Sequence, residues 1–302
     1  REVIEMWDQH PQIEKNLQAL YGLLNQYAEK KAENKNQLQI KIFSTSEVQW
    51  QACLPRTWLF ADGSAFINHI KLVRMARKAP LPETLLTVPL MYQAECGQFL
   101  SPTQDVPQID FKHGTDFEAE VGVITGFVPM GTSPDEALKK IRLFVLINDV
   151  SLRGLIPDEL AQGFGFFQSK PASSLSPFAV TADELVDSYR EGRVHLPLLV
   201  KYNERDFGRA NAGEMHFHFG QLIAHAARTR NLVAGTLIGS GTVANEDTTR
   251  GASCLAEKRM LEQIHQGEVK TPFMKVGDKI EIEMLDLSGQ SIFGKISKKI
   301  IQ

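Results

Sequence analysis

The feature that most constrains the fold is a run of alternating acidic and apolar residues within positions 115–124. Successive side chains of a β-strand point to opposite faces, so Asp116, Glu118 and Glu120 are expected to share one face. The apolar residues between them would form a core-facing surface on the other side. This alternation predicts a strand in a sheet that has at least one buried face.

Three carboxylates on one face need compensation, because neighbouring like charges repel each other. A divalent cation supplies it, since Mg²⁺ and Ca²⁺ bind several anionic oxygens at close range. Residues 142–147 are apolar after the leading arginine and predict a fully buried strand, with Asp149 just beyond its end. Asp149 is therefore a candidate for a further carboxylate at the same cation. A solvated acidic face without any metal is the alternative, and it stays open at this point.

Composition argues against several classes of function. The chain has 302 residues and a formal net charge of -3, which provides no basic surface for nucleic acid or an anionic membrane. No apolar run approaches the length of a membrane span, and the first residues do not resemble a signal peptide. Cys53, Cys96 and Cys254 lie far apart without CxxC spacing, which favours a reducing compartment and argues against zinc. We expect a cytoplasmic protein that acts on a small molecule.

The chain divides into two predicted regions. Residues 1–54 form a small accessory region, with helix predicted over 1–29, a linker over 30–37 and a strand over 38–43. Residues 55–302 contain short strands between Gly, Pro and Asp turns, together with a few helices, and would carry the functional site. Helices are expected at 65–77, 133–140, 157–162 and around 222–227, and strands at 58–61, 236–242, 279–284 and 291–296. The pattern is typical of a β-rich α+β fold.

Several common sites lack support in the sequence. There is no GxGxxG, no P-loop and no GxSxG segment, so neither nucleotide binding nor a serine-hydrolase arrangement is indicated.

Five segments, taken in order, resemble the fumarylacetoacetate hydrolase family. They are residues 116–121, residues 148–153, Phe-Gln-Ser-Lys at 167–170 with Ser176-Pro177, Gly-Ser-Gly-Thr at 239–242, and Gly277-Asp278. The resemblance runs from about Trp58 to the C-terminus. The spacing from Asp62 to His69 and the segment 89–92 resemble the fumarylacetoacetase branch. The resemblance implies a mixed β-sandwich roll with peripheral helices, usually a homodimer, with a metal site at its mouth.

The resemblance also implies a metal centre and its ligands. Glu118, Glu120 and Asp149 would bind Mg²⁺ or Ca²⁺, and Asp62 resembles the additional acidic ligand of the fumarylacetoacetase branch. Mn²⁺ would suit the same oxygen ligands.

Further roles follow from the same resemblance. His69 resembles the general base of the family, and Glu257 the carboxylate that orients it. The resemblance also implies that four residues hold substrate oxygens, namely Lys170, Arg153, Tyr92 and Thr242. Lys170 is in addition a predicted catalytic residue. One position departs from the pattern, because Ile156 stands where fumarylacetoacetases usually have a substrate-facing Gln.

Each of these side chains has a structural alternative. Lys170 and Arg153 could be ion-pair partners of nearby acids, and His69 a partly buried structural histidine. Tyr92 could be an aromatic core residue, and Thr242 could simply hydrogen-bond its glycine turn.

The implied activity is metal-dependent hydrolysis of a carbon–carbon bond in a fumarylacetoacetate-like β-diketo acid, as in the last step of tyrosine breakdown. The two oxygens of such a substrate would chelate the cation, and a carboxylate-held histidine suits the deprotonation of a water. Alternatives within the family are acylpyruvate hydrolysis, oxaloacetate decarboxylation or tautomerisation, and 2-hydroxymuconate-type isomerisation; Ile156 slightly favours these. A third alternative is a non-catalytic binding protein on the same scaffold.

Overall fold

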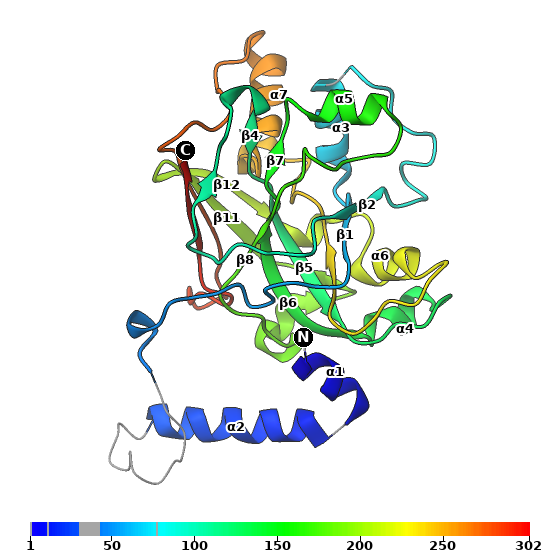
Figure 1. Cartoon of the computed structure of the whole chain (residues 1–302), viewed down its shortest axis with the longest axis vertical. Coiled ribbons are helices and arrows are strands. Elements are labelled where there is room, and N and C mark those ends of the chain that lie inside the picture. Colours follow the sequence, from blue (N-terminus) through cyan, green and yellow to red (C-terminus); the bar gives the residue numbers. More distant parts are fainter. Residues whose placement is uncertain (1, 11, 30–42, 77) are drawn as a thin grey trace.

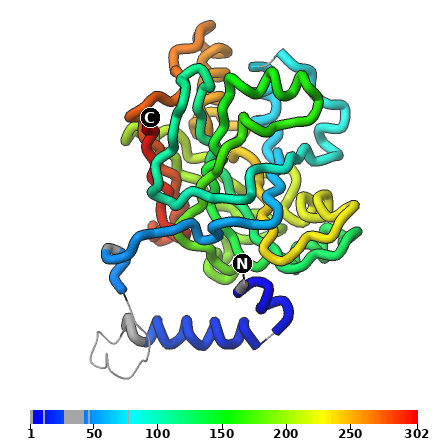
Figure 2. The backbone as a smooth tube through the Cα atoms, viewed as in Figure 1, coloured from blue at the N-terminus to red at the C-terminus, as the bar shows by residue number. Residues whose placement is uncertain are grey.

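The computed structural model describes residues 2–10, 12–29, 43–76 and 78–302. Two curled β-sheets form the centre of the main body, and helices lie around them (Figures 1 and 2). The described helices are α1 (Glu2–Gln9), α2 (Gln12–Glu29), α3 (Ile67–Ala76), α4 (Pro134–Leu138), α5 (Ile156–Ala161), α6 (Phe219–Ala226) and α7 (Leu255–Gln266). Short 3₁₀ turns are η1 (Thr45–Glu47), η2 (Phe111–His113), η3 (Ala182–Ser188), η4 (Ala212–Glu214) and η5 (Thr248–Arg250).

The larger sheet has the strand order β2-β1-β13-β5-β6-β8. Only β1 and β13 pair in parallel, and the other neighbours are antiparallel. Its strands are β2 (Met91–Ala94), β1 (Phe60–Gly63), β13 (Thr236–Gly239), β5 (Ala119–Thr125), β6 (Ile141–Asn148) and β8 (Ser174–Leu175). All residues of β1, β13 and β5 are buried, as expected for a sheet that is covered on both faces.

The second sheet has the order β12-β11-β14-β15-β3. Its strands are β12 (Arg205–Asn211), β11 (Pro197–Tyr202), β14 (Lys279–Met284), β15 (Ile296–Ile301) and β3 (Val106–Pro107). In β14 buried and partly exposed side chains alternate strictly, so this sheet has one core face and one wet face. Two small ribbons complete the strands: β9 (Tyr189–Arg190) with β10 (Arg193–Val194), and β4 (Thr115–Asp116) with β7 (Ser151–Leu152).

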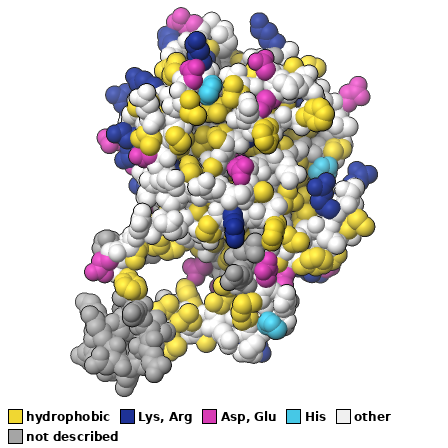
Figure 3. All heavy atoms as spheres, in the orientation of Figure 1, with side chains coloured by type: hydrophobic (Ala, Val, Ile, Leu, Met, Phe, Trp, Pro, Cys, Tyr) yellow, Lys and Arg dark blue, Asp and Glu magenta, His cyan; other side chains and the backbone are white. Residues whose placement is uncertain are grey.

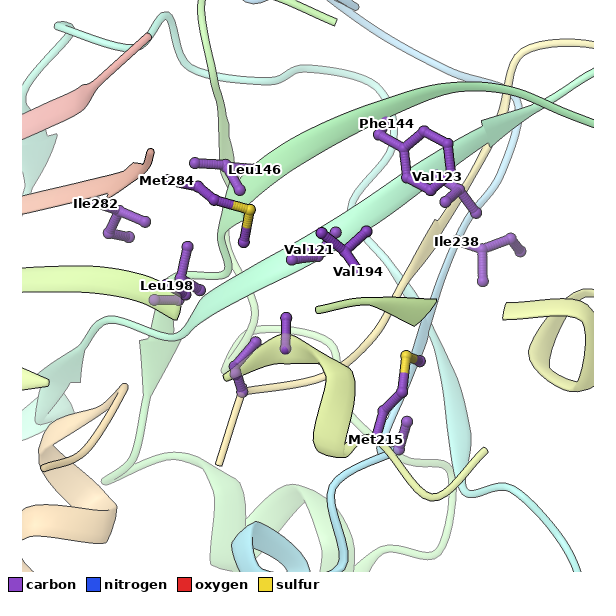
Figure 4. Packing of buried hydrophobic residues seen from close by; sticks show 14 of the residues in the cluster. Val121, Val123, Phe144, Leu146, Val194, Leu198, Met215, Ile238, Ile282 and Met284 are labelled. Carbon is purple, nitrogen blue, oxygen red and sulfur yellow. The ribbon is translucent and has the colours of Figure 1, made fainter. Parts of the chain in front are cut away.

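The main hydrophobic core lies between the two sheets (Figure 4). Val121 and Leu146 of the larger sheet belong to the same buried cluster as Leu198 and Ile282 of the second sheet. A second cluster covers the opposite face of the larger sheet, where Ile4, Leu54 and Phe60 join Ile124, Val145 and Leu237. Apolar packing on both faces therefore holds β5, which carries Glu120, and β6, which Asp149 follows, in place.

Most of the elements predicted from sequence periodicity are present with shifted ends. Ser133 caps α4 by accepting a hydrogen bond from the Glu136 amide, and Pro134 opens the helix. The helix predicted at 65–77 is α3, and the strand predicted at 58–61 is β1, displaced by two residues. The predicted return strand at 291–296 is wrong, because the segment makes only an isolated bridge at Ser291 and β15 begins at Ile296. The predicted linker and strand at 30–43 fall outside the described residues, apart from Phe43.

The N-terminal helices lie at one end of the molecule. Figure 1 shows α1 next to the lower end of the sheets and α2 farther from them, running across the bottom of the view. Ile4 is buried, and Asp8 forms an ion pair of 2.8 Å with Arg142 of β6. The apolar side chains of α2 remain largely exposed, as in Leu20 and Tyr21, and Figure 3 shows hydrophobic side chains gathered on this projecting part. Within the described chain, no helix is both long enough and apolar enough to cross a membrane.

Candidate active site

The strand order brings three carboxylates together. Asp62 of β1 and Glu120 of β5 flank β13, which lies between these strands, and Asp149 follows β6. The β13 residue between them is Gly239, where an added Cβ would collide with the Asp62 carboxylate and crowd that of Glu120. The missing side chain therefore lets two acids from separate strands meet. Oxygen atoms of Asp62, Glu120 and Asp149 lie within 4.8 Å of one another.

This cluster is deeply buried, and one of its members, Glu120, has no hydrogen-bond partner within the described part of the chain. Asp62 is 3% exposed, while Glu120 and Asp149 are fully enclosed. Neither carboxylate oxygen of Glu120 has a hydrogen-bond partner among the described residues. Burial, reinforced by Asp62 and Asp149, raises the pKa of Glu120 well above its ordinary value. Burial, followed by the charge of Asp149, also raises the pKa of Asp62, to about 8.

The cluster has the properties that a hard divalent cation requires. It offers only oxygen ligands, and unpartnered buried carboxylates are stabilised when an ion neutralises them. Mg²⁺, Ca²⁺ and Mn²⁺ are the ions that such ligands suit. The solvated acidic face, considered as an alternative from sequence, is ruled out by the burial of these side chains. The chain thus presents a carboxylate cluster that is suited to a divalent metal.

Glu118 lies beside the cluster and binds two cations of the chain. Its carboxylate accepts from Arg153 at 2.7 Å and from Lys170 at 2.6 Å. Burial tends to raise the pKa of Glu118, but Lys170, Arg153 and His69 outweigh it and hold that pKa well below its ordinary value. Lys170 also lies 2.5 Å from Asp149. The ion-pair alternative for Lys170 and Arg153 is therefore present in the structure, and the ligand role of Glu118 stays a prediction.

Asp116 differs from the expectation of one continuous acidic face. The alternating segment breaks between Asp116, where β4 ends, and Ala119, where β5 begins. The Asp116 carboxylate accepts from the backbone amides of Leu255 and Ala256, at 2.7 and 3.0 Å, and from Arg153. It thus caps the N-terminus of α7, which favours negative charge there. Asp116 is a structural carboxylate that also holds Arg153.

His69 and Glu257 form the second part of the site. The Nδ1 atom of His69, on α3, lies 2.8 Å from the Glu257 carboxylate in the first turn of α7. Its Nε2 atom lies 3.8 Å from Glu118, so the free nitrogen is directed toward the acidic residues. The second oxygen of Glu257 accepts from the Ser253 amide. Both side chains are buried, and the pair can hold the imidazole in one tautomer.

Cys254 lies close to this pair. Burial, followed by the charge of Glu257, raises the pKa of the Cys254 thiol well above its ordinary value. A neutral buried thiol is a poor nucleophile and a poor ligand, so His69, Glu257 and Cys254 do not form an evident metal site.

The two remaining predicted residues lie on the same cavity. The Tyr92 hydroxyl donates to Asp149 at 2.5 Å, and burial followed by the Asp149 charge raises the pKa of Tyr92 well above its ordinary value. Tyr92 therefore keeps its proton and acts as a donor. The Thr242 hydroxyl is buried without a hydrogen-bond partner among the described residues, which leaves it available to a ligand. Both residues line a cavity of about 300 Å³ together with Asp62, His69, Glu120 and Lys170.

Three contributors were not predicted from the sequence. Ser173 donates to Asp149 at 2.6 Å, and the ring of Phe166 lies 5.9 Å from the Lys170 ammonium. Glu159 of α5 accepts from the amides of Phe167, Gln168 and Ser169, which fixes the turn before Lys170. None of these carries a spacing signal, because their roles depend on how residues 156–173 fold over the cavity.

The ten predicted residues all contribute to this region of the molecule, although only three of the four acidic ligands cluster directly. Ile156, the position that departs from the fumarylacetoacetase pattern, is buried and lines the cavity. The catalytic and binding roles remain predictions.

Comparison with known proteins places this chain in a family. A family model described as fumarylacetoacetate (FAA) hydrolase C-terminal matches residues 59–301. A 2,4-didehydro-3-deoxy-L-rhamnonate hydrolase of Sphingomonas sp. (strain SKA58) is 30% identical over 168 residues, 54% of this chain and 54% of that protein. The fumarylacetoacetase of Caenorhabditis elegans is 25% identical over 236 residues, 68% of this chain and 56% of that protein. The chain thus spans about half the length of the curated relatives it matches.

Solved structures show the same fold at low identity. A 5-carboxymethyl-2-hydroxymuconate delta-isomerase from Mycobacterium smegmatis has a TM-score of 0.60 at 15% identity, covering 87% of this chain and 85% of that one. A 2-hydroxyhepta-2,4-diene-1,7-dioate isomerase from Mycobacterium marinum has a TM-score of 0.58 at 14% identity, covering 87% and 82% respectively. The predicted mixed α+β architecture is therefore confirmed, and with the family match over most of its length, the chain belongs to the fumarylacetoacetate hydrolase family.

Proposed function

We propose that this protein is a metal-dependent hydrolase that cleaves a carbon–carbon bond in a fumarylacetoacetate-like β-diketo acid. The observation that carries the proposal is the buried carboxylate cluster of Asp62, Glu120 and Asp149, in which Glu120 has no hydrogen-bond partner among the described residues, beside the His69–Glu257 pair. One part suits a divalent cation, and the other suits proton transfer from a water. Together they supply the two functions that hydrolysis of a β-diketone needs.

The proposed step begins with a water near the free Nε2 of His69. His69 takes its proton, because Glu257 holds Nδ1 and stabilises the imidazolium that forms. The resulting hydroxide attacks one carbonyl carbon, and the adjacent carbon–carbon bond breaks to leave an enolate. A divalent cation bound by the carboxylates would polarise the substrate oxygens and stabilise the enolate charge. The enolate is then protonated to give the second product.

Cationic and neutral donors would orient the substrate. Lys170 lines the cavity and carries a pKa that burial lowers but that Asp149 and Glu118 raise above its ordinary value, so its ammonium stays charged. It would attract the substrate carboxylate, while the Thr242 hydroxyl would donate a hydrogen bond to a substrate oxygen. Tyr92 would donate to the substrate only when its proton is no longer given to Asp149. Arg153 would act mainly by holding Glu118 and Asp116 in place.

The test is loss of the diketone absorbance of fumarylacetoacetate and of simple acylpyruvates. The purified protein is assayed with Mg²⁺, with Ca²⁺ and with chelator. We expect metal-dependent hydrolysis, with kcat reduced by about 10² to 10⁴ in His69→Ala because a general base contributes on that order. His265→Ala is the matched control, since His265 is an exposed histidine of α7.

Two outcomes would contradict the proposal. If the protein binds metal but cleaves no diketone, hydrolysis is wrong, and oxaloacetate decarboxylation or isomerisation becomes the leading assignment. If His69→Ala and His265→Ala lose activity equally, the base is not His69.

Isomerisation or tautomerisation of a 2-hydroxymuconate-type acid is the second candidate. Ile156 favours it, because an apolar side chain lines the cavity where the fumarylacetoacetase pattern has a polar one. Such a reaction needs proton transfer without an attacking water. Exchange of solvent deuterium into a 2-oxo acid without bond cleavage would distinguish it from hydrolysis.

We further propose a cytoplasmic homodimer that acts in aromatic amino acid breakdown, as the family resemblance implies. Light scattering of the full chain would measure the dimer mass, and growth on tyrosine after gene deletion would test the pathway.

A further inference from the structure

A second and larger cavity adjoins the candidate active site. Its volume is about 890 Å³, against about 300 Å³ for the site cavity. It lies between α3, α5 and α7, which stand together at the top of Figure 1, and we call it the α3–α7 groove. Val73, Arg153, Ile156 and Leu160 line both cavities. The two cavities are therefore neighbours that share one wall.

The walls of the α3–α7 groove are mainly apolar. Met75 and Val269 line it while remaining 54% and 40% exposed, and Met260 and Phe273 form part of its wall. No Asp or Glu is among its described lining residues. An open apolar hollow gains free energy when an apolar group covers it and displaces water.

The more enclosed cations of the groove already have partners. The Arg259 guanidinium lies 4.3 Å from the centre of the Phe273 ring and donates to the Thr271 carbonyl. Arg153 is held by Asp116 and Glu118. These two arginines are therefore engaged within the chain, and Lys78 and Lys112, which also line the groove, are exposed to solvent, so apolar contact is the main contribution of its enclosed surface.

Apart from Arg153, the residues that line both cavities are apolar as well. Ile156 is 1% exposed and Val73 is 8% exposed, whereas Leu160 is 39% exposed at the junction of the two cavities. A ligand that extended from the carboxylate cluster into the groove would cross this wall at Leu160, the most exposed of these three side chains. A polar distal group would lose hydration beside Ile156 and Val73, and Arg153, the charged residue of this wall, is already held by Asp116 and Glu118.

We propose that the substrate carries an extended apolar acyl chain, which runs from the active site past Leu160 into the α3–α7 groove. This inference rests on the proposed β-diketo acid hydrolysis and specifies its substrate class. The diketo head group binds at the carboxylate cluster, and the acyl chain is bound by the groove. Ile156 is then a specificity residue, because it gives the acyl chain an apolar wall.

The test is a series of acylpyruvates with acyl chains of two, four, six, eight and ten carbons. We expect kcat/KM to rise about two- to fourfold for each added methylene until the groove is filled, as the burial of apolar surface predicts. Succinylpyruvate, which has a distal carboxylate, is compared with the apolar chain of equal length and should be the poorer substrate.

Two variants place a charge in the groove. Met75→Glu and Val269→Glu alter exposed positions, so the fold should tolerate them. Each should lower the ratio of kcat/KM for the ten-carbon chain to that for the two-carbon chain by about tenfold or more. Val276→Glu is the matched control, because Val276 is 52% exposed and lines neither cavity, and its ratio should match the wild type.

The remaining outcomes separate this inference from the proposed function. A flat or falling dependence on chain length, or a preference for succinylpyruvate, overturns the apolar-chain proposal while leaving hydrolysis in place. Variants that change the molecular mass of the assembly but not the chain-length dependence overturn it too, since the groove is then an interface between copies. If no diketone is cleaved, the proposed function fails. The groove is then tested by calorimetry, which measures the binding of 2-oxo acids of four, eight and ten carbons in the presence of Mg²⁺. Affinity that rises with length supports the groove, and equal affinities overturn it.

Discussion

The Asp62 carboxylate shows how a single buried acid couples stability to pH. It lies against Gly239 and beside two other carboxylates, so its charged form is disfavoured in the folded chain. Burial, with the Asp149 charge next, raises its pKa from 3.8 to about 8. Without a metal, the folded protein therefore holds a proton on Asp62 that the unfolded chain releases above about pH 4.

The first prediction concerns Asp62→Asn in the presence of chelator. Because the folded state binds the extra proton, the contribution of Asp62 to the free energy of unfolding falls as pH rises, by about 1.4 kcal/mol per unit at most. This contribution decreases between about pH 4 and about pH 8 and no longer changes above that range. The Tm of the wild type relative to Asp62→Asn should thus decrease from pH 5 to pH 8.

Thermal unfolding at several pH values measures this difference. Saturating Mg²⁺ serves as the control condition, because it should raise the Tm of the wild type at pH 8 far more than that of Asp62→Asn. A difference in Tm that does not change with pH would show that Asp62 titrates at its ordinary value.

At the residue scale, the sequence predicted which residues belong to the site better than it predicted which contacts they make. Glu120 and Asp149 were expected near one cation, because alternation and strand ends are local properties of the chain. Asp116 was misplaced, since its contact with the α7 amides joins segments that are 139 and 140 residues apart. No local pattern records such a contact, and the break between β4 and β5 that makes it possible is equally non-local.

At the scale of elements, the N-terminus of α7 links structure to the site. Asp116 accepts two of its free amides, and Glu257 in its first turn holds His69. The position of the proposed base thus depends on how well this helix end is anchored. Helix α3 carries His69 itself and packs against α7.

The second prediction concerns Asp116→Asn. The new NH₂ group faces donors on α7 and Arg153. The free energy of unfolding of the variant should therefore be lower than that of the wild type by about 2–4 kcal/mol. The proposed hydrolysis should also slow, because Glu257 and Arg153 lose their support. Denaturant unfolding and kcat are the measurements. Asp110→Asn is the control, since Asp110 caps the exposed turn η2, and a similar loss in both variants would refute a special role for Asp116.

Element positions were largely predictable, because apolar periodicity and caps such as Ser133 are written in adjacent residues. The pairing of elements was not. The order β2-β1-β13-β5-β6-β8 joins strands from opposite ends of the chain, and Asp62 meets Glu120 only through that order. The family resemblance, rather than periodicity, indicated that meeting.

At the scale of the whole molecule, the N-terminal region is joined to the body through few polar contacts. Asp8 of α1 bonds Arg142 and the Phe127 amide, and Ile4 is buried in the second core cluster. Ala52 and Leu54 belong to that same cluster, so apolar packing continues across the predicted boundary between residues 54 and 55. That boundary stays a prediction.

The third prediction concerns Asp8→Ala. Loss of its charged hydrogen bonds should lower the free energy of unfolding by about 1–3 kcal/mol and expose α1 to proteases. The kcat should stay unchanged, because Asp8 lines neither the site cavity nor the α3–α7 groove. Glu136→Ala is the control, since it breaks the exposed pair with Lys139 and should change stability little. Unchanged proteolysis of Asp8→Ala would mean that apolar contacts alone hold α1.

Arg153 has a consequence for how this chain can change over evolutionary time. Its guanidinium bonds Asp116 through Nε and Glu118 through a terminal nitrogen, at 2.9 and 2.7 Å. The planar guanidinium fixes the directions of its donors and so sets the two acids at a defined angle, whereas the rotatable ammonium of a lysine imposes no such angle. Positions 116, 118 and 153 should therefore be inherited as a unit: a descendant that loses one of the three is expected to have replaced the others as well.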